Sequence, residues 1–178
     1  DVGVALSTVS VPHQPLQVDS LPSAELGLLK VLMEGDPLML EHVMTRIDPN
    51  DFAHPVTRGL MEVISGYYVN QRSFSIDELM TPELNPEVRE LAAHLAIDRE
   101  SISEYWSRND SDLGEPNPWK AARDCLIQIQ QNSIDRESRN IQDHLSNPEL
   151  EADDEQEMLR RFRDLREKVE NLKRLISG

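Results

Sequence analysis

The sequence predicts an all-α protein: a compact bundle of five or six short helices followed by a long C-terminal antiparallel helical hairpin. Apolar residues recur at spacings of three and four, which is typical of helices with one buried face. Aromatic residues make up 4% of the chain, and Val, Ile and Tyr rarely alternate with polar residues as they do in strands. Residues 119–146 and 155–176 contain neither glycine nor proline, so each stretch is expected to form a long helix.

Three segments of the chain differ in composition, and its 178 residues suit one or two domains. Residues 1–20 keep no regular period and are interrupted by Pro12 and Pro15, so they are expected to be a linker or flexible segment. Residues 21–118 are expected to form the helical bundle, and residues 119–178 the long helix and the hairpin. The first residue is not Met, which suggests a piece of a longer polypeptide.

Two short helices are expected at the start of the bundle. Ser23 is predicted to cap the first, and Gly35 and Pro37 to end it. The apolar stripe of this helix consists of Leu26, Leu29, Val31, Leu32 and Met33. The second helix presents Leu38, Leu40, Val43, Met44 and Ile47.

The stretch RIDPNDFAHPVTRGLMEVI, residues 46–64, predicts a tightly specified turn between the second and third helices. Asp48 before Pro49 suits a turn, because proline restricts φ and the carboxylate accepts backbone N–H bonds. Phe52 is a large apolar residue in a polar segment, so we expect it to fill the core. Pro55 suits the start of the next helix, where its missing N–H costs little.

The rest of the bundle is predicted from further stripes and caps. Gly66 is expected to weaken the end of the third helix. Ser75 is expected to cap a short helix, and Asn85 with Pro86 to begin another. Residues 99–106 are expected to add a turn or a short helix. The apolar stripe of the third helix consists of Val56, Leu60, Val63, Ile64 and Tyr67.

The last helix carries a sustained heptad pattern, in which apolar residues alternate at spacings of four and three. These residues are Met158, Phe162, Leu165, Val169, Leu172 and Ile176. The preceding long helix matches only in part, with Ile127, Ile134, Ile141 and Leu145 interrupted by polar Gln130 and Ser138. We therefore expect a hairpin whose own core is small. Its apolar residues are covered either by a partner protein or by folding back onto the bundle.

The charge distribution argues against direct binding of nucleic acid. The chain has 18 basic and 33 acidic residues, for a formal net charge of -15. Residues 1–118 carry 7 basic and 20 acidic residues, so this part should repel a phosphate backbone. Residues 119–178 carry 11 basic and 13 acidic residues, which is typical of solvated helical surfaces.

Catalytic, cofactor and metal sites are not expected. The five histidines, His13, His42, His54, His94 and His144, lie in separate segments without metal-ligand spacing. The single cysteine, Cys125, excludes an internal disulfide and is expected to be a buried or half-buried thiol. No glycine-rich phosphate loop, membrane span or signal peptide occurs in the sequence, so we expect a cytoplasmic protein.

The stretch LLKVLMEGDPLMLEHVMTRIDPNDFAHPVTRGLMEVI resembles a pattern shared by two bacterial replication domains. They are the helicase-binding C-terminal domain of the DnaG-type replicative primase and the N-terminal domain of the DnaB-type replicative helicase. In both, an Asp-Pro step joins two helices, and a turn with Asp51, Phe52, Pro55 and Arg58 opens the third. The resemblance covers roughly residues 21–98. The long charged tail is similar to the terminal hairpin of the primase, and the helicase domain remains the alternative.

The resemblance implies a non-catalytic domain of DNA primase. Its hairpin would dock on the N-terminal domains of the hexameric replicative helicase, recruit primase to the replication fork and modulate helicase activity. The fragment would be a monomer alone, without cofactor or metal. The residues expected at the partner surface are Leu159, Arg161, Leu172, Lys173, Leu175 and Ile176.

Overall fold

The computed structural model is all-helical in the part of the chain that it describes, which confirms the predicted class. The described residues are 16–34, 36–70, 76–97, 117–145 and 152–177. Within them lie seven α-helices and two 3-10 helices. The predicted cap Ser75 and the helix expected at 99–106 lie outside the described residues.

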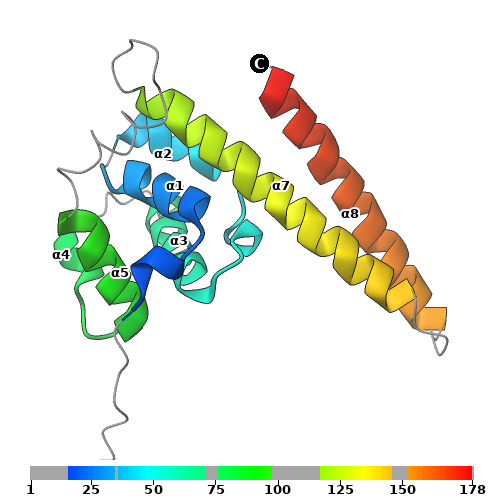
Figure 1. Ribbon diagram of the computed structural model, residues 1–178, viewed down its shortest axis with the longest axis horizontal. Coiled ribbons are helices and arrows are strands. Elements are labelled where there is room, and N and C mark those ends of the chain that lie inside the picture. Colours follow the sequence, from blue (N-terminus) through cyan, green and yellow to red (C-terminus); the bar gives the residue numbers. More distant parts are fainter. Residues whose placement is uncertain (1–15, 35, 71–75, 98–116, 146–151, 178) are drawn as a thin grey trace, which may run out of the picture.

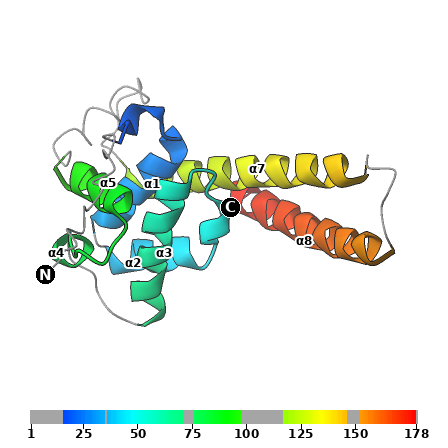
Figure 2. The ribbon, with the colours of Figure 1, turned by 90° about the horizontal axis from the view of Figure 1, so that it is seen from below.

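The helices follow the chain in the order shown in Figure 1. The elements are η1 (Val18–Ser20), α1 (Ser23–Met33), α2 (Pro37–Met44), η2 (Pro49–Asp51), α3 (Pro55–Val69), α4 (Ile76–Leu79), α5 (Pro86–Ile97), α7 (Pro118–Leu145) and α8 (Ala152–Ser177). Helices α1 to α5 gather around one core, which we call the helical body. Helix α7 runs along this body and beyond it, and α8 returns antiparallel to α7 (Figures 1 and 2).

The core of the helical body is built from the predicted stripes and from one face of α7. Phe52 is fully buried in it, which confirms the prediction that this residue fills the core. Leu16 and Val18 also pack against the core, although residues 1–20 were expected to be a linker. The largest fully buried side chains are Phe52, Leu28, Leu29, Leu32, Met39, Leu60, Met61, Ile64, Leu79, Leu91, Leu126 and Ile129.

Local capping signals place several helix ends. Asp36 caps α2 by accepting hydrogen bonds from the backbone N–H groups of Leu38 (2.9 Å) and Met39 (3.4 Å). Asn85 accepts from the backbone N–H of Glu87 at 2.9 Å, as predicted for the start of α5. The prediction for Ser23 was wrong, because Ser23 is already the first residue of α1. Each cap satisfies N–H groups that the helix itself leaves unpaired.

Two predicted helix faces differ in part from those observed. In α2, Leu38 is 67% exposed and the unpredicted Met39 is 2% exposed, whereas Val43 and Ile47 are buried as predicted. In α7, the first half buries a face against the helical body that the heptad comparison did not identify. This face consists of Ala121, Ala122, Cys125, Leu126, Ile129 and Ser133. The N-terminal half of α7 is therefore part of the body.

Helices α3 and α5 approach closely at Gly59. A Cβ atom on Gly59 would lie 2.9 Å from Cγ2 of Val88, a β-branched side chain with little freedom to move. Gly66 lies further along α3 and is exposed. A Cβ atom on Gly66 would have no neighbouring atom within 4 Å. The packing of α3 against α5 thus requires a glycine at position 59 but not at position 66.

These two glycines provide a matched pair of substitutions. Gly59→Ala should lower the free energy of unfolding by about 1–3 kcal/mol, because the added methyl overpacks the contact with Val88. Gly66→Ala should raise it by about 0.5–1 kcal/mol, because alanine favours the helix and meets no neighbour. Urea denaturation followed by circular dichroism measures both. Equal effects of the two variants would contradict the close approach of α3 and α5.

Phe52→Ala should lower the free energy of unfolding by about 3–5 kcal/mol, because a fully buried aromatic ring would leave a cavity. The same denaturation experiment measures the loss. Phe162→Ala is the matched control, since Phe162 is 51% exposed on α8 and should cost much less. A melting curve identical to that of the unchanged chain would show that Phe52 does not support the core.

Candidate functional site

The turn between α2 and α3 is closed by its own side chains. Asp48 and Asp51 form a reciprocal cap of η2: Oδ1 of Asp48 accepts from the backbone N–H of Asn50 (2.8 Å), and Oδ2 of Asp51 accepts from that of Asp48 (3.0 Å). The carbonyl oxygen of Phe52 accepts from Nη2 of Arg58 at 2.9 Å. The Asp-Pro and Asp-Phe steps that carry the family resemblance therefore have local structural roles.

A buried carboxylate on α1 holds the start of α3. Glu25 is 3% exposed, and its oxygens accept from the backbone N–H groups of Ala53 (2.6 Å) and His54 (3.4 Å). The hydroxyl of Thr57 also donates to Glu25. Unpaired N–H groups at the start of a helix attract negative charge, so Glu25 fixes where α3 begins relative to α1. The sequence analysis did not identify Glu25, because its partners lie 28 to 32 residues away.

The carboxylate of Asp51 connects the turn to both long helices. Its Oδ1 accepts from the hydroxyl of Ser133 on α7 at 2.7 Å and from Nζ of Lys168 on α8 at 2.7 Å. Nη2 of Arg136, also on α7, donates to the carbonyl oxygens of Asp51 (3.0 Å) and Asn50 (3.1 Å). We call this set of contacts the Asp51 cluster. It places α7 and α8 against the turn through polar contacts.

Helix α8 divides its predicted heptad residues between a covered side and an exposed side. Met158, Leu165 and Leu172 are spaced by seven residues and are 5%, 9% and 7% exposed. The intervening residues Phe162 and Ile176 are 51% and 52% exposed, and Leu159 is 56% exposed. We call Leu159, Phe162, Val169 and Ile176 the α8 stripe, in which Val169 is half-buried. The chain itself thus covers half of the heptad residues and part of Val169.

The residues predicted at the partner surface fall into different environments. Leu159 and Ile176 belong to the α8 stripe, whereas Leu172 is covered. Arg161 donates to Oδ1 of Asn140 on α7 at 3.1 Å and lies between two carboxylates, Glu137 at 3.9 Å and Glu157 at 3.8 Å. Arg161 therefore links α8 to α7.

The last two predicted residues lie near the end of α8. Lys173 is exposed and hydrogen-bonds to Glu170 at 2.9 Å. This hydrogen bond, and then the charge of Lys173, hold the pKa of Glu170 below its usual value. The side chain of Leu175 lies outside the described residues.

In the described part of the chain, no group of three or more His, Cys, Asp or Glu residues could hold a metal ion. Cys125 is buried, and burial followed by the charge of Asp124 raises the pKa of its thiol to about 12. A thiol of that pKa is protonated at neutral pH and is a poor nucleophile. The prediction of a buried cysteine is confirmed.

Among the helices that the structure describes, none combines the length and the apolar character needed to cross a membrane.

The Asp51 cluster predicts a clear effect of removing one charge. Asp51→Asn should lower the free energy of unfolding by about 1.5–3 kcal/mol. Both carboxylate oxygens of Asp51 accept hydrogen bonds, whereas an amide has only one acceptor oxygen. The substitution also removes the negative charge that pairs with Lys168. Asp164→Asn is the matched control, since Asp164 is exposed on α8. Chemical denaturation of both variants checks the prediction. A loss no larger than that of the control would mean that the cluster does not hold the long helices.

Comparison with models of protein families gives a match over most of the chain. The model of a family described as a domain of unknown function, DUF8430, matches residues 30–176, from within α1 to near the end of α8. No curated protein and no solved structure matches the chain significantly. The match includes the turn, the Asp51 cluster and the α8 stripe, and it spans more than four-fifths of the chain. This chain therefore belongs to the DUF8430 family.

Proposed function

We propose that this chain is a protein-docking domain of a bacterial DnaG-type replicative primase. Its hairpin of α7 and α8 would bind the N-terminal domains of the hexameric replicative helicase, recruit primase to the replication fork and modulate helicase activity. In this proposal the fragment itself is cytoplasmic, non-catalytic and monomeric, and it does not bind nucleic acid directly. The proposal rests on the sequence resemblance together with one observation, the exposed α8 stripe.

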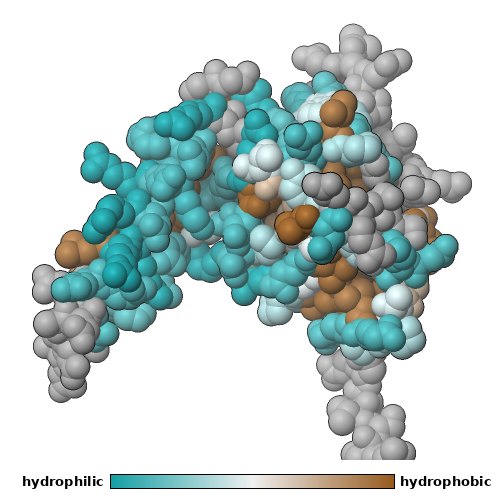
Figure 3. Space-filling view, turned by 180° about the vertical axis from the view of Figure 1, so that it is seen from behind, coloured by the Kyte–Doolittle hydropathy of each residue, from teal (hydrophilic) through white to brown (hydrophobic). Residues whose placement is uncertain are grey.

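The α8 stripe supports docking because it leaves large apolar side chains in water. Leu159, Phe162 and Ile176 are each about half exposed. Burying a fully exposed side chain of this kind is worth about 1.5–3 kcal/mol, so a partner that covers the exposed half of several gains part of that free energy from each. The face of α7 and α8 seen in Figure 3 is mostly hydrophilic. An isolated apolar stripe on a polar surface is typical of an interaction site.

The charge pattern around the stripe indicates the chemistry of the partner. Arg166 and Lys173 follow Phe162 and Val169 by four residues each, so they lie on the same face of α8. Both residues are exposed. We therefore expect the partner to offer an apolar surface bordered by carboxylates. Charges at the border of such an interface mainly raise the association rate and the specificity.

Substitutions in the stripe test this proposal. Leu159→Asp and Ile176→Asp should each weaken binding to the cognate replicative helicase by about tenfold or more, because each would bury a charge at the interface. Leu38→Asp is the matched control, because Leu38 on α2 is 67% exposed and lies outside the stripe. Isothermal titration calorimetry with the purified helicase hexamer measures the affinities. Helicase binding that the stripe substitutions leave unchanged would exclude α8 as the docking surface.

Point substitutions in the α8 stripe test docking more specifically than deletion of α8. Removing α8 would also remove Lys168 from the Asp51 cluster and uncover the apolar side chains that Met158 and Leu165 now cover. Leu172→Asp has the same defect, because Leu172 is 7% exposed. Both changes would combine loss of stability with loss of docking.

The alternative function is that of an N-terminal domain of a DnaB-type helicase, which would associate with copies of itself. The same α8 stripe would then be covered by a second copy. Light scattering separates the two proposals. A docking domain should have the mass of one chain alone and form a larger complex when helicase is added, whereas the alternative predicts oligomers of the chain alone.

A further inference from the structure

A second candidate site lies between α8 and the helical body. In the view of Figure 1, helices α7 and α8 diverge toward the C-terminal end of α8. Between this end of α8 and the body lies a cavity of about 830 Å³. Pockets for small organic ligands usually measure about 300–1,000 Å³. The cavity is lined by α2 and the segment after it, by α7 and by α8.

The cavity is basic although the chain as a whole is strongly acidic. Four cationic side chains line it: Arg46 from the segment after α2, Arg123 from α7, and Lys168 and Arg174 from α8. The chain has only 18 basic residues against 33 acidic ones, so this concentration of positive charge is local. The positive charge comes from three separate elements that surround the cavity, and not from a run of basic residues along one helix.

Two carboxylates also line the cavity, and both are already engaged. Asp51 accepts from Ser133 and Lys168, and Asp48 accepts from the backbone N–H and the side-chain amide of Asn50. Formal charge around the cavity is therefore four positive against two negative. An anion that enters meets a net positive field in a partly enclosed space.

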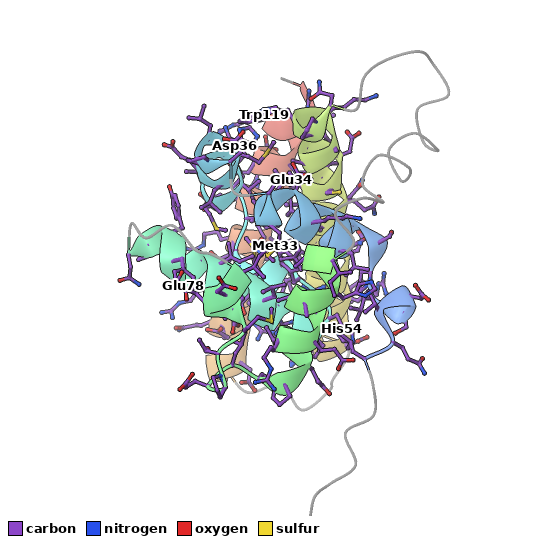
Figure 4. The ribbon with its side chains drawn as sticks, turned by 90° about the vertical axis from the view of Figure 1, so that its left-hand side faces the viewer. Met33, Glu34, Asp36, His54, Glu78 and Trp119 are labelled. Carbon is purple, nitrogen blue, oxygen red and sulfur yellow. The ribbon has the colours of Figure 1, made fainter. Side chains whose placement is uncertain are left out.

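His42 also lines the cavity. Burial, and then the charge of Arg46, lower the pKa of its imidazole. Its ring contacts that of Trp119 edge-on, with ring centroids 5.4 Å apart. Trp119 lies at the same end of the molecule as Asp36, the cap of α2 (Figure 4). This contact holds the start of α7 against α2 beside the cavity.

Gln130 connects two parts of the cavity wall. Its Nε2 on α7 donates to the carbonyl oxygen of Arg46 in the segment after α2. Oε1 of the same amide is buried and has no donor within the described residues, so it is closed to a ligand in the cavity.

We propose that the cavity binds a small phosphorylated molecule. The guanidinium groups of Arg46 and Arg174 suit phosphate oxygens, which such groups bind in bidentate fashion. Arg123, which donates to the carbonyl oxygen of Ile176 at 2.9 Å, and Lys168, which is paired with Asp51, add positive charge. The phosphate contacts join α8 to the body, because Arg174 belongs to α8 and Arg46 to the segment after α2.

Isothermal titration calorimetry of the full chain tests the site with four probes at low ionic strength. Adenosine triphosphate and ribose 5-phosphate carry both phosphate and hydroxyl groups, pyrophosphate carries phosphate alone, and citrate carries carboxylates and one hydroxyl. We expect saturable binding of adenosine triphosphate that weakens as salt is added. No saturable binding of the three phosphorylated probes at millimolar concentration would overturn the proposal. Citrate binding as tight as that of adenosine triphosphate would overturn the assignment to phosphate.

Charge-matched variants locate the binding. Arg174→Gln and Arg46→Gln should each weaken binding of adenosine triphosphate by about tenfold or more, since each removes charge-assisted hydrogen bonds. Arg160→Gln and Arg163→Gln, on exposed positions of α8 outside the cavity, are the controls and should leave the affinity unchanged. Equal losses in both pairs would show non-specific attraction. Arg46 also hydrogen-bonds within the chain, so Arg174→Gln alone carries the test if Arg46→Gln unfolds the protein.

Discussion

The Asp51 carboxylate is the interaction on which the arrangement of the long helices depends. It is 5% exposed, and a buried charge is tolerated only where hydrogen bonds and an opposite charge surround it. Its partners lie 3, 82 and 117 residues away in the sequence, on the turn itself, on α7 and on α8. Satisfying this one group therefore requires three separate segments to meet. The apolar packing of α7 on the body supplies most of the burial, and the Asp51 cluster determines where the helices sit.

Glu25 does for α3 what Asp51 does for α7 and α8. The two carboxylates hold the backbone on the two sides of Phe52. Glu25 accepts from the N–H groups of the two residues after Phe52. Asp51 accepts from the N–H group of Asp48, before Phe52. With both in place, the turn cannot shift without breaking charge-assisted hydrogen bonds. The Asp-Pro and Asp-Phe steps are thus explained by architecture alone. The proposed docking surface lies elsewhere, on α8.

Local signals predicted the elements that depend on neighbouring residues, and non-local contacts account for the failures. Asn85 and Pro86 predicted the start of α5 because a cap involves adjacent residues. The burial of Glu25 could not be predicted, because its partners come from the other side of the turn. In α2, apolar residues at three successive positions left the buried face ambiguous. Gln130 looked like a weak point of the hairpin, yet it hydrogen-bonds to the backbone of Arg46. The basic cavity had no sequence signal, since its cations come from three distant segments.

Helix α8 combines a covered side, the exposed stripe and the wall of the cavity, so its position relative to the body affects both proposed interactions. Polar contacts hold its C-terminal half: Lys168 to Asp51, and Nη2 of Arg123 to the carbonyl oxygen of Ile176 at 2.9 Å. A ligand that bridges Arg46 and Arg174 favours the conformation in which α8 lies against the body. A partner protein that recognises the stripe in that conformation gains from the same ordering. Because coupling between two sites is reciprocal, each would then strengthen the binding of the other by the same factor. A partner that instead requires α8 to move away would compete with the ligand, so the sign of the coupling reports the position of α8 in the docked state.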